Sequence, residues 1–284
     1  MIAPLNKKYR WLILFVFSVL FLVFIPILVF YAIGYRIDKN FEITPTGGVY
    51  VYYPDAGINV SINDSAPEKT TIFTKSIFIQ NLKPSSYNIK VEKTGYITWN
   101  KTVNVSEKKV AEAYPFLIPQ VIATSSIPLD IKSKVVQLFN STTSPSVIVQ
   151  KNAKLASTTV ATTTEKLVEI RKDISLYTDK NTVLAKWTGD IDSVPFYFCL
   201  PKDACEEKLE VIDSKETLGE VAFFPNRNDV VLFQTPEGIF VTEFDKRSPQ
   251  NILPIVLGSK LDFRVDGSVL YIKDKNNYYS ILLQ

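Results

Sequence analysis

Residues 11–35 have the sequence WLILFVFSVLFLVFIPILVFYAIGY, which contains no Lys, Arg, Asp or Glu. As a helix, a run of this length is roughly 37 Å long, against about 30 Å for the hydrocarbon core of a bilayer. A soluble helix is usually apolar on one side only, whereas this run is apolar throughout. Pro26 removes one backbone hydrogen bond, which membrane helices tolerate. The stretch therefore predicts a transmembrane helix.

A cleaved secretory signal is the alternative interpretation of this run. The apolar part of such a signal spans about 7–15 residues and ends at a small-x-small site. Here the run is longer, and the cleavage point that the sequence offers, near Ala32, is crowded by Phe30, Tyr31 and Tyr35. The sequence favours an uncleaved signal-anchor.

The charges beside this run predict its orientation. Lys7, Lys8 and Arg10 precede it without any acidic residue, whereas the basic residues after it are mixed with acidic ones. Cytoplasmic flanks of membrane helices are enriched in Lys and Arg. We therefore expect residues 1–10 to be a cytoplasmic tail, and the protein to be a single-pass protein of the cell membrane whose remaining domains are extracytoplasmic.

The composition excludes several classes of function. The chain has 32 basic and 29 acidic residues, and three of the basic ones precede the helix, so the outer part carries 29 of each sign. This balance disfavours a nucleic-acid partner, which needs clustered positive charge. The chain has no histidine, which excludes His-based triads and His metal sites. We expect no metal and no cofactor.

The chain has two cysteines, Cys199 and Cys205. In an oxidising compartment such a close pair is expected to form a local disulfide. The spacing differs from the C-x2-C of thiol oxidoreductases, which disfavours a redox role. Two reduced, inert thiols are the remaining alternative.

Residues 36–46 are polar, and we expect them to be a spacer between the membrane and the first folded unit. Between residues 47 and 119, short runs alternate apolar and polar side chains and are separated by turn-forming clusters of Pro, Gly, Asn and Ser. Alternation with period two is typical of half-buried antiparallel strands. These residues therefore predict a small antiparallel β-sandwich.

The same residues carry a motif pattern. The motif positions are Pro54, Asp55, Ala56 and Gly57 after the first strand, then Leu82-x-Pro84-x-x-Tyr87-x-Ile-x-Val91, then Gly95 and Tyr96. Over about residues 45–118 this order resembles the PEGA domain, a small extracytoplasmic β module of surface and envelope proteins. The resemblance implies a binding or spacer module and no chemistry. Turn formation by Pro and Gly is the structural explanation of the same positions.

Residues 120–166 are rich in Ser and Thr. Apolar runs at residues 135–138 and 147–149 predict strands joined by loops. Residues 167–284 then repeat a unit of strand, tight turn, strand, turn and strand, at residues 167–187, 229–256 and 261–283. Such repeats are typical of propeller blades, although the length supplies about four blades at most. The expected fold is mainly β, with one N-terminal transmembrane helix, a β-sandwich and a partial, propeller-like β-meander domain.

No phosphate-binding loop, nucleophile elbow or dinucleotide fingerprint occurs in the sequence. A carboxylate-based surface hydrolase would need an acidic pair. The available pairs, Asp190 with Asp192 and Glu206 with Glu207, lie among basic residues, so solvated surface charge explains them better. We expect no catalytic residues and no enzyme activity.

The sequence favours a non-catalytic binding or scaffolding role at the cell envelope, with a cell-wall glycan, a peptide or an envelope protein as ligand. Tyr50, Tyr52 and Trp99 are candidate contact aromatics, and burial in the core is the alternative for each. A subunit of an envelope assembly or a sensor that acts through helix pairing is the second hypothesis. The helix lacks a small-x-x-x-small face, which disfavours this hypothesis.

Overall fold

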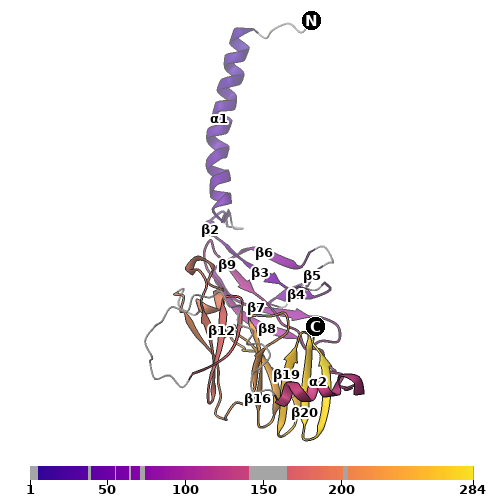
Figure 1. Ribbon diagram of the computed structural model, residues 1–284. Helices are drawn as coiled ribbons and strands as arrows, with labels where there is room; N and C mark the ends of the chain where they lie inside the picture. Colours follow the sequence, from indigo (N-terminus) through magenta and orange to yellow (C-terminus); the bar gives the residue numbers. More distant parts are fainter. Residues whose placement is uncertain are drawn as a thin grey trace. The chain divides into compact units, whose positions relative to one another are not determined.

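A computed structural model describes residues 6–283 except 38–39, 55, 64, 71–73, 141–164 and 201–203. Its fold is mainly β with one long N-terminal helix, as predicted (Figure 1). Internal contacts divide the chain into two compact units. The first comprises Met1–Lys90 and Thr102–Pro115, and the second comprises Val91–Lys101 and Phe116–Gln284.

Helix α1 (Lys7–Ala32) has the length and composition of a membrane span. Its most apolar part has a mean hydropathy of 3.2, and none of its residues is buried by the described part of the chain. Pro26 lies inside the helix without ending it. A helix that is apolar on every side is stable only where its whole surface is removed from water.

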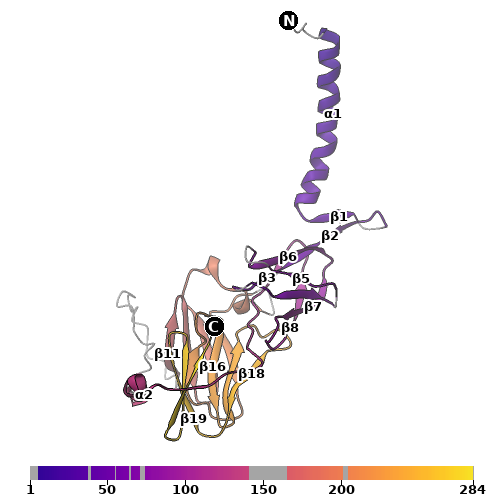
Figure 2. The same ribbon diagram turned by 90° about the vertical axis from the view of Figure 1, so that its right-hand side faces the viewer.

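A two-stranded hairpin follows α1 immediately (Figure 2). Strand β1 (Tyr35–Ile37) pairs antiparallel with β2 (Ile43–Pro45), within the segment expected to be a spacer. The Gly34 carbonyl accepts hydrogen bonds from the backbone N–H and the Oγ1 of Thr46, both at 2.8 Å. Gly34 has φ +93°, a conformation that favours glycine. The helix and the first strand are thus joined without a flexible linker.

Seven further strands form the sheets of the expected sandwich. One sheet has the order β6-β3-β9 and the other β5-β4-β7-β8. The strands are β3 (Gly47–Tyr52), β4 (Asn59–Ile62), β5 (Glu68–Lys69), β6 (Ser76–Leu82), β7 (Ser85–Glu92), β8 (Trp99–Val105) and β9 (Val110–Ala113). Alternate side chains are buried, among them Val49, Val51, Val60, Ile89 and Val103. The period-two pattern therefore separates core from surface as predicted.

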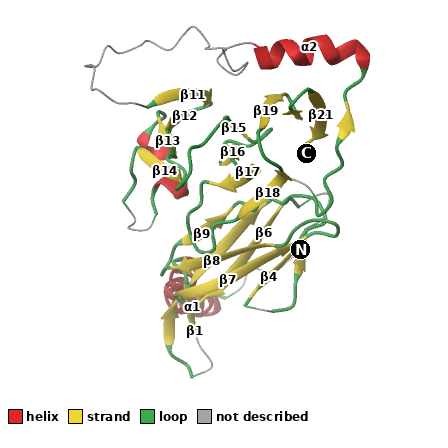
Figure 3. Cartoon of the chain, turned by 90° about the horizontal axis from the view of Figure 1, so that it is seen from below, coloured by secondary structure: helices red, strands yellow, loops and turns green. Residues whose placement is uncertain are grey.

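In its described part, the second unit contains three four-stranded antiparallel sheets (Figure 3). The first consists of β11 (Lys166–Arg171), β12 (Ile174–Asp179), β13 (Thr182–Trp187) and β14 (Lys208–Asp213). The second consists of β15 (Val221–Phe223), β16 (Val230–Thr235), β17 (Gly238–Glu243) and β18 (Ile252–Leu257). The third has the order β10 (Ser125–Ser126), β21 (Asn277–Leu282), β20 (Val269–Asp274) and β19 (Leu261–Asp266). The three predicted meanders are confirmed, each with a fourth strand, and no backbone ladder among the described residues closes them into a barrel.

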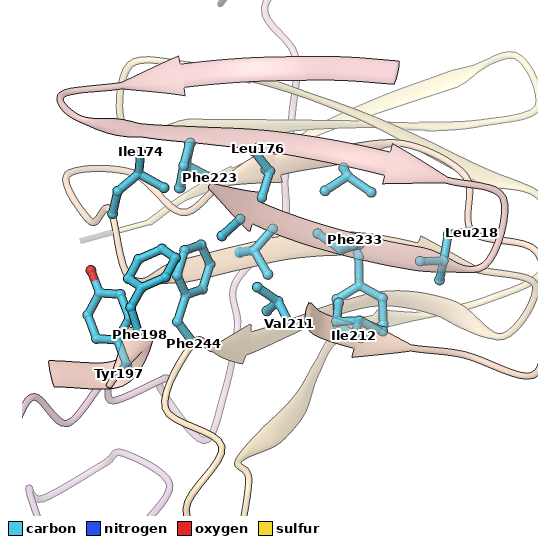
Figure 4. Packing of buried hydrophobic residues seen from close by; sticks show 14 residues of the cluster. Ile174, Leu176, Tyr197, Phe198, Val211, Ile212, Leu218, Phe223, Phe233 and Phe244 are labelled. Carbon is cyan, nitrogen blue, oxygen red and sulfur yellow. The ribbon is translucent and has the colours of Figure 1, made fainter. Parts of the chain in front are cut away.

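The first two of these sheets share one hydrophobic core (Figure 4). Ile174 and Leu176 of β12 and Phe223 of β15 are fully buried. The Phe244 ring lies edge-on to that of Tyr197, with ring centroids 5.7 Å apart. Tyr197 belongs to a 3-10 turn, Phe196–Phe198, which the Cys199–Cys205 disulfide follows. The expected disulfide is therefore present, in the loop that supplies aromatic side chains to this core.

Residues 129–140 form a helix, where the sequence predicted a strand. In α2 (Leu129–Asn140), Val135 is buried and the Phe139 ring lies 5.6 Å from that of Tyr278 on β21. A short apolar run can form either a buried strand or a helix, and its composition does not distinguish the two. Packing against a neighbouring sheet decides which one forms. The second expected strand, residues 147–149, lies outside the described residues.

Candidate functional site

The outer strands of three sheets meet at a cavity of about 410 Å³ in the second unit. Its walls come from the edge strands β11, β15 and β19 and from the turns beside them. The polar side chains that line it include Glu169, Arg171, Glu220, Arg264, Asp266 and Ser268.

Arg171 joins the first sheet to the second at this cavity. Its Nη1 donates to the carbonyls of Phe224 at 2.6 Å and Arg227 at 2.8 Å, and its Nη2 donates to Glu169 Oε1 at 2.8 Å. The other carboxylate oxygen, Glu169 Oε2, accepts the backbone N–H of Phe223 at 3.1 Å. Charge-assisted bonds of this kind are stronger than neutral ones, so the pair connects β11 to β15.

Arg264 makes the corresponding connection from the third sheet. Its Nη1 lies 3.0 Å from Glu220 Oε2 and 3.1 Å from Asp262 Oδ1. Its guanidinium lies 5.4 Å from the centre of the Phe139 ring of α2. The Nε of Arg264 is buried and has no hydrogen-bond partner among the described residues. Two arginines and their carboxylate partners thus lie at the cavity, with both signs of charge on its wall.

The wall of this cavity has groups that can recognise a polar ligand. The arginines are engaged by carboxylates and carbonyls, and the wall offers donors and acceptors side by side. Among the residues that the structure describes, no group of three or more His, Cys, Asp or Glu is placed to hold a metal ion. The cavity is therefore a candidate binding site for a small polar or charged group.

A second polar centre of the same unit is closed to solvent. Lys101 of β8 has no exposed surface, and its Nζ donates to Glu243 Oε1 at 2.5 Å. The same Nζ contacts the carbonyls of Asp245, Arg247 and Pro249, at 2.8–3.0 Å. A buried ammonium needs a partner for each of its protons, and this site supplies them.

The carboxylate of Glu243 is bound equally closely. Its Oε2 accepts the indole N–H of Trp99 at 2.8 Å, and its Oε1 accepts the Asn251 side chain at 2.6 Å. Burial raises the pKa of Glu243, while the Lys101 ammonium and the Asn251 amide act in the opposite direction. Because the Lys101 and Glu243 side chains are both buried, we interpret the pair as structural. Sequence reasoning missed it, although Lys101 stands in phase with the buried residues Trp99 and Val103 of β8.

The predicted contact aromatics separate into two groups. Tyr52 is 39% exposed and Tyr50 is half-buried, and both point away from the core side of β3. Phe78 lies opposite Tyr50 in the register and is exposed, and the Tyr114 ring lies 6.2 Å from that of Tyr52. These four side chains form an aromatic face on the first unit. Trp99 is 2% exposed and bonded to Glu243, so it is a core residue.

The motif residues of the sandwich have structural positions. Gly57 and Gly95 have φ of +83° and +81°, which explains glycine at both sites. Pro54 and Ala56 lie at bends beside Gly57, and Asp55 lies outside the described residues. Tyr96 pairs with Pro119 in an isolated bridge, and the Lys93 ammonium lies 4.5 Å from its ring centre.

The acidic pairs considered for hydrolysis are surface residues. Asp190, Asp192, Glu206 and Glu207 are all exposed, and none of them lines the cavity. A comparison with known protein families finds none that matches the chain, and no curated protein matches it either.

Proposed function

We propose that this chain is a single-pass membrane protein of the cell envelope that holds two β units outside the cytoplasm and has a non-catalytic binding role. Helix α1 carries the proposal, because its apolar surface is uncovered along its whole length. Lipid is the environment that such a surface requires. The Cys199–Cys205 disulfide supports the outward orientation, since disulfides persist in oxidising compartments.

The binding role is supported by the aromatic face of Tyr50, Tyr52, Phe78 and Tyr114. Tyr52 and Phe78 are exposed and the other two rings are half-buried, so together they offer flat apolar area beside tyrosine hydroxyl groups, a surface suited to contact with sugar rings. The PEGA-like pattern of the same strands agrees with a surface module. A cell-wall glycan is therefore the ligand that we place first.

Two measurements test the proposal. A reporter that is active only outside the cytoplasm, fused after Gln284, should be active, and the intact chain should remain in the membrane fraction after an alkaline carbonate wash. A cytoplasmic reporter signal, or release into the supernatant, would overturn the anchor.

The binding role is tested separately, by retention of the purified chain on insoluble cell-wall glycan. Tyr52→Ala should lower retention several-fold, because it removes an exposed ring of the aromatic face. Tyr271→Ala, on β20 of the second unit, is the matched control and should leave retention unchanged. Equal retention of both variants would reject this face as the ligand site, and crosslinking between copies in membranes would instead favour an assembly subunit.

A further inference from the structure

An apolar surface lies directly beyond the end of α1. Ile37, Phe41 and Ile43 of the β1–β2 hairpin are 69, 89 and 61% exposed. Ile37 and Ile43 are direct partners in the antiparallel register, so their side chains share one face of the hairpin. Ile33, between helix and hairpin, is 47% exposed. These four residues, here called the hairpin surface, place large apolar side chains beside a helix that is itself uncovered.

The hairpin is held firmly against the helix end. Arg36 Nη1 donates to the carbonyls of Tyr31 at 2.7 Å and Tyr35 at 2.8 Å, and its guanidinium stacks 3.7 Å from the centre of the Tyr31 ring. The Phe30 and Tyr35 rings meet edge to face at 5.5 Å. With Gly34 bonded as described above, the hairpin has a fixed position relative to α1.

Helix length places this hairpin at the bilayer boundary. From Trp11 to Ala32 the helix rises roughly 33 Å, slightly more than the hydrocarbon thickness of about 30 Å. Ile33 and Gly34 separate the helix from β1, so the strand begins in the headgroup layer. Interfacial elements bury apolar side chains about 5–10 Å into this layer.

We infer that the β1–β2 hairpin lies on the membrane surface and inserts the hairpin surface among the lipids of the leaflet where α1 ends. The inference rests on the proposed anchoring by α1. Lys108 supports it, because its Nζ donates to the Tyr35 hydroxyl at 2.9 Å and Arg36 lies beside the same residue. Cations at this level face lipid phosphates, while the apolar side chains lie deeper.

Depth-dependent fluorescence quenching tests the inference on the full chain in vesicles of phosphatidylcholine and phosphatidylglycerol. An environment-sensitive thiol label is attached at Ile43→Cys, and lipids with a nitroxide near the top of the acyl chain act as the quencher. The disulfide-bonded Cys199 and Cys205 do not react with the label. Labels at Leu22→Cys, within α1, and at Tyr52→Cys, at the far end of β3, are the two controls.

The expected result is at least twofold quenching at positions 43 and 22 and none at position 52. Exchanging Ile37 and Phe41 for Ser should return the label at position 43 to the level of position 52. Quenching at position 22 alone would overturn the hairpin insertion and leave the anchor intact. Absence of quenching at position 22 would overturn both.

Discussion

The Nζ of Lys101 lies 2.5 Å from Oε1 of Glu243, and the two side chains are 0 and 2% exposed. Lys101→Met removes the cation and leaves a buried carboxylate without its charge partner. Such a loss costs roughly 3–5 kcal/mol of unfolding free energy. We expect a much lower urea midpoint in detergent, followed by tryptophan fluorescence, because Trp99 donates to the same carboxylate.

The matched control for this variant is Lys246→Met. Lys246 pairs with Glu210 at 3.6 Å, and both side chains are about half exposed. Exposed pairs contribute about 0–1 kcal/mol, so the control should unfold near the native midpoint. If the two variants had the same midpoint, the Lys101 pair would have no special structural role.

Glu243 should also give stability a pH dependence. Burial raises its pKa above the ordinary value of 4.5, and Lys101 opposes this only in part. The folded chain then binds the proton before the unfolded chain does as the pH falls. The contribution of Glu243 to stability is therefore fully present below the pKa that it has in the unfolded chain. This contribution is lost as the pH rises through the pKa that it has in the folded chain.

Relative to Glu243→Gln, the native chain should gain unfolding free energy as the pH is lowered toward the ordinary pKa of 4.5. Urea midpoints of the two proteins at successive pH values provide the measurement. If the difference between the two urea midpoints did not change with pH, or changed in the opposite direction, the pKa of Glu243 would not be raised in the folded chain.

Arg171→Met should loosen the contact between the first two sheets of the second unit. The change removes the guanidinium group. The carbonyls of Phe224 and Arg227 and the buried carboxylate of Glu169 then lose the hydrogen bonds that Arg171 donates to them. Losing these bonds should cost about 2–4 kcal/mol. Amide hydrogen exchange in β15 should accelerate, because the Phe223 N–H bonds to Glu169. Lys208→Met, which removes an exposed partner of Glu165, should not change exchange in β15.

Two glycines of the sandwich differ in what a methyl group would meet. A Cβ on Gly47 would lie 2.4 Å from the Ser106 carbonyl oxygen, whereas a Cβ on Gly95 meets nothing within 4 Å. Gly95→Ala should cost about 1 kcal/mol through its positive φ alone. Gly47→Ala requires backbone movement and should cost roughly 2–3 kcal/mol. Thermal melting of the two variants checks this order, and a reversed order would contradict the packing around Gly47.

Removal of the disulfide by Cys199→Ser with Cys205→Ser should have a modest effect. Closing a loop this short contributes about 2 kcal/mol in the chain-entropy model. In the native chain isolated from cells, both thiols should resist alkylation until a reductant is added. Immediate alkylation of both would show that this part of the chain lies in a reducing compartment.

Period-two alternation and tight turns were sufficient to predict the three meanders. Paired strands in these meanders are close together in the sequence. The turns between them contain residues with positive φ, such as Lys172, Lys180 and Gly267. Strand β14 was missed because residues 188–207, with the disulfide loop, separate it from β13. Helix α2 was predicted as strand because its apolar runs are short and its packing partners lie on β19 and β21.

The cavity was not predictable because its charged residues come from three distant strands. Glu169 with Arg171, and Asp262 with Arg264, have the i, i+2 spacing of solvated edge-strand residues, and sequence alone does not show that these edges converge. Lys101 offered a clearer signal, since a lysine in phase with core residues needs a buried partner. The partner lies 142 residues away, so its identity required the fold.

The short junction at Gly34 has a mechanical consequence. Because Thr46 bonds to Gly34 and Arg36 bonds to the Tyr31 carbonyl, the proposed membrane anchor continues into the first β unit through a hydrogen-bonded junction, which should transmit a tilt of the anchor to the strands. Bilayer thickness affects how far a membrane helix tilts, so on the proposed anchoring it should also affect the direction in which Tyr50 and Tyr52 are presented.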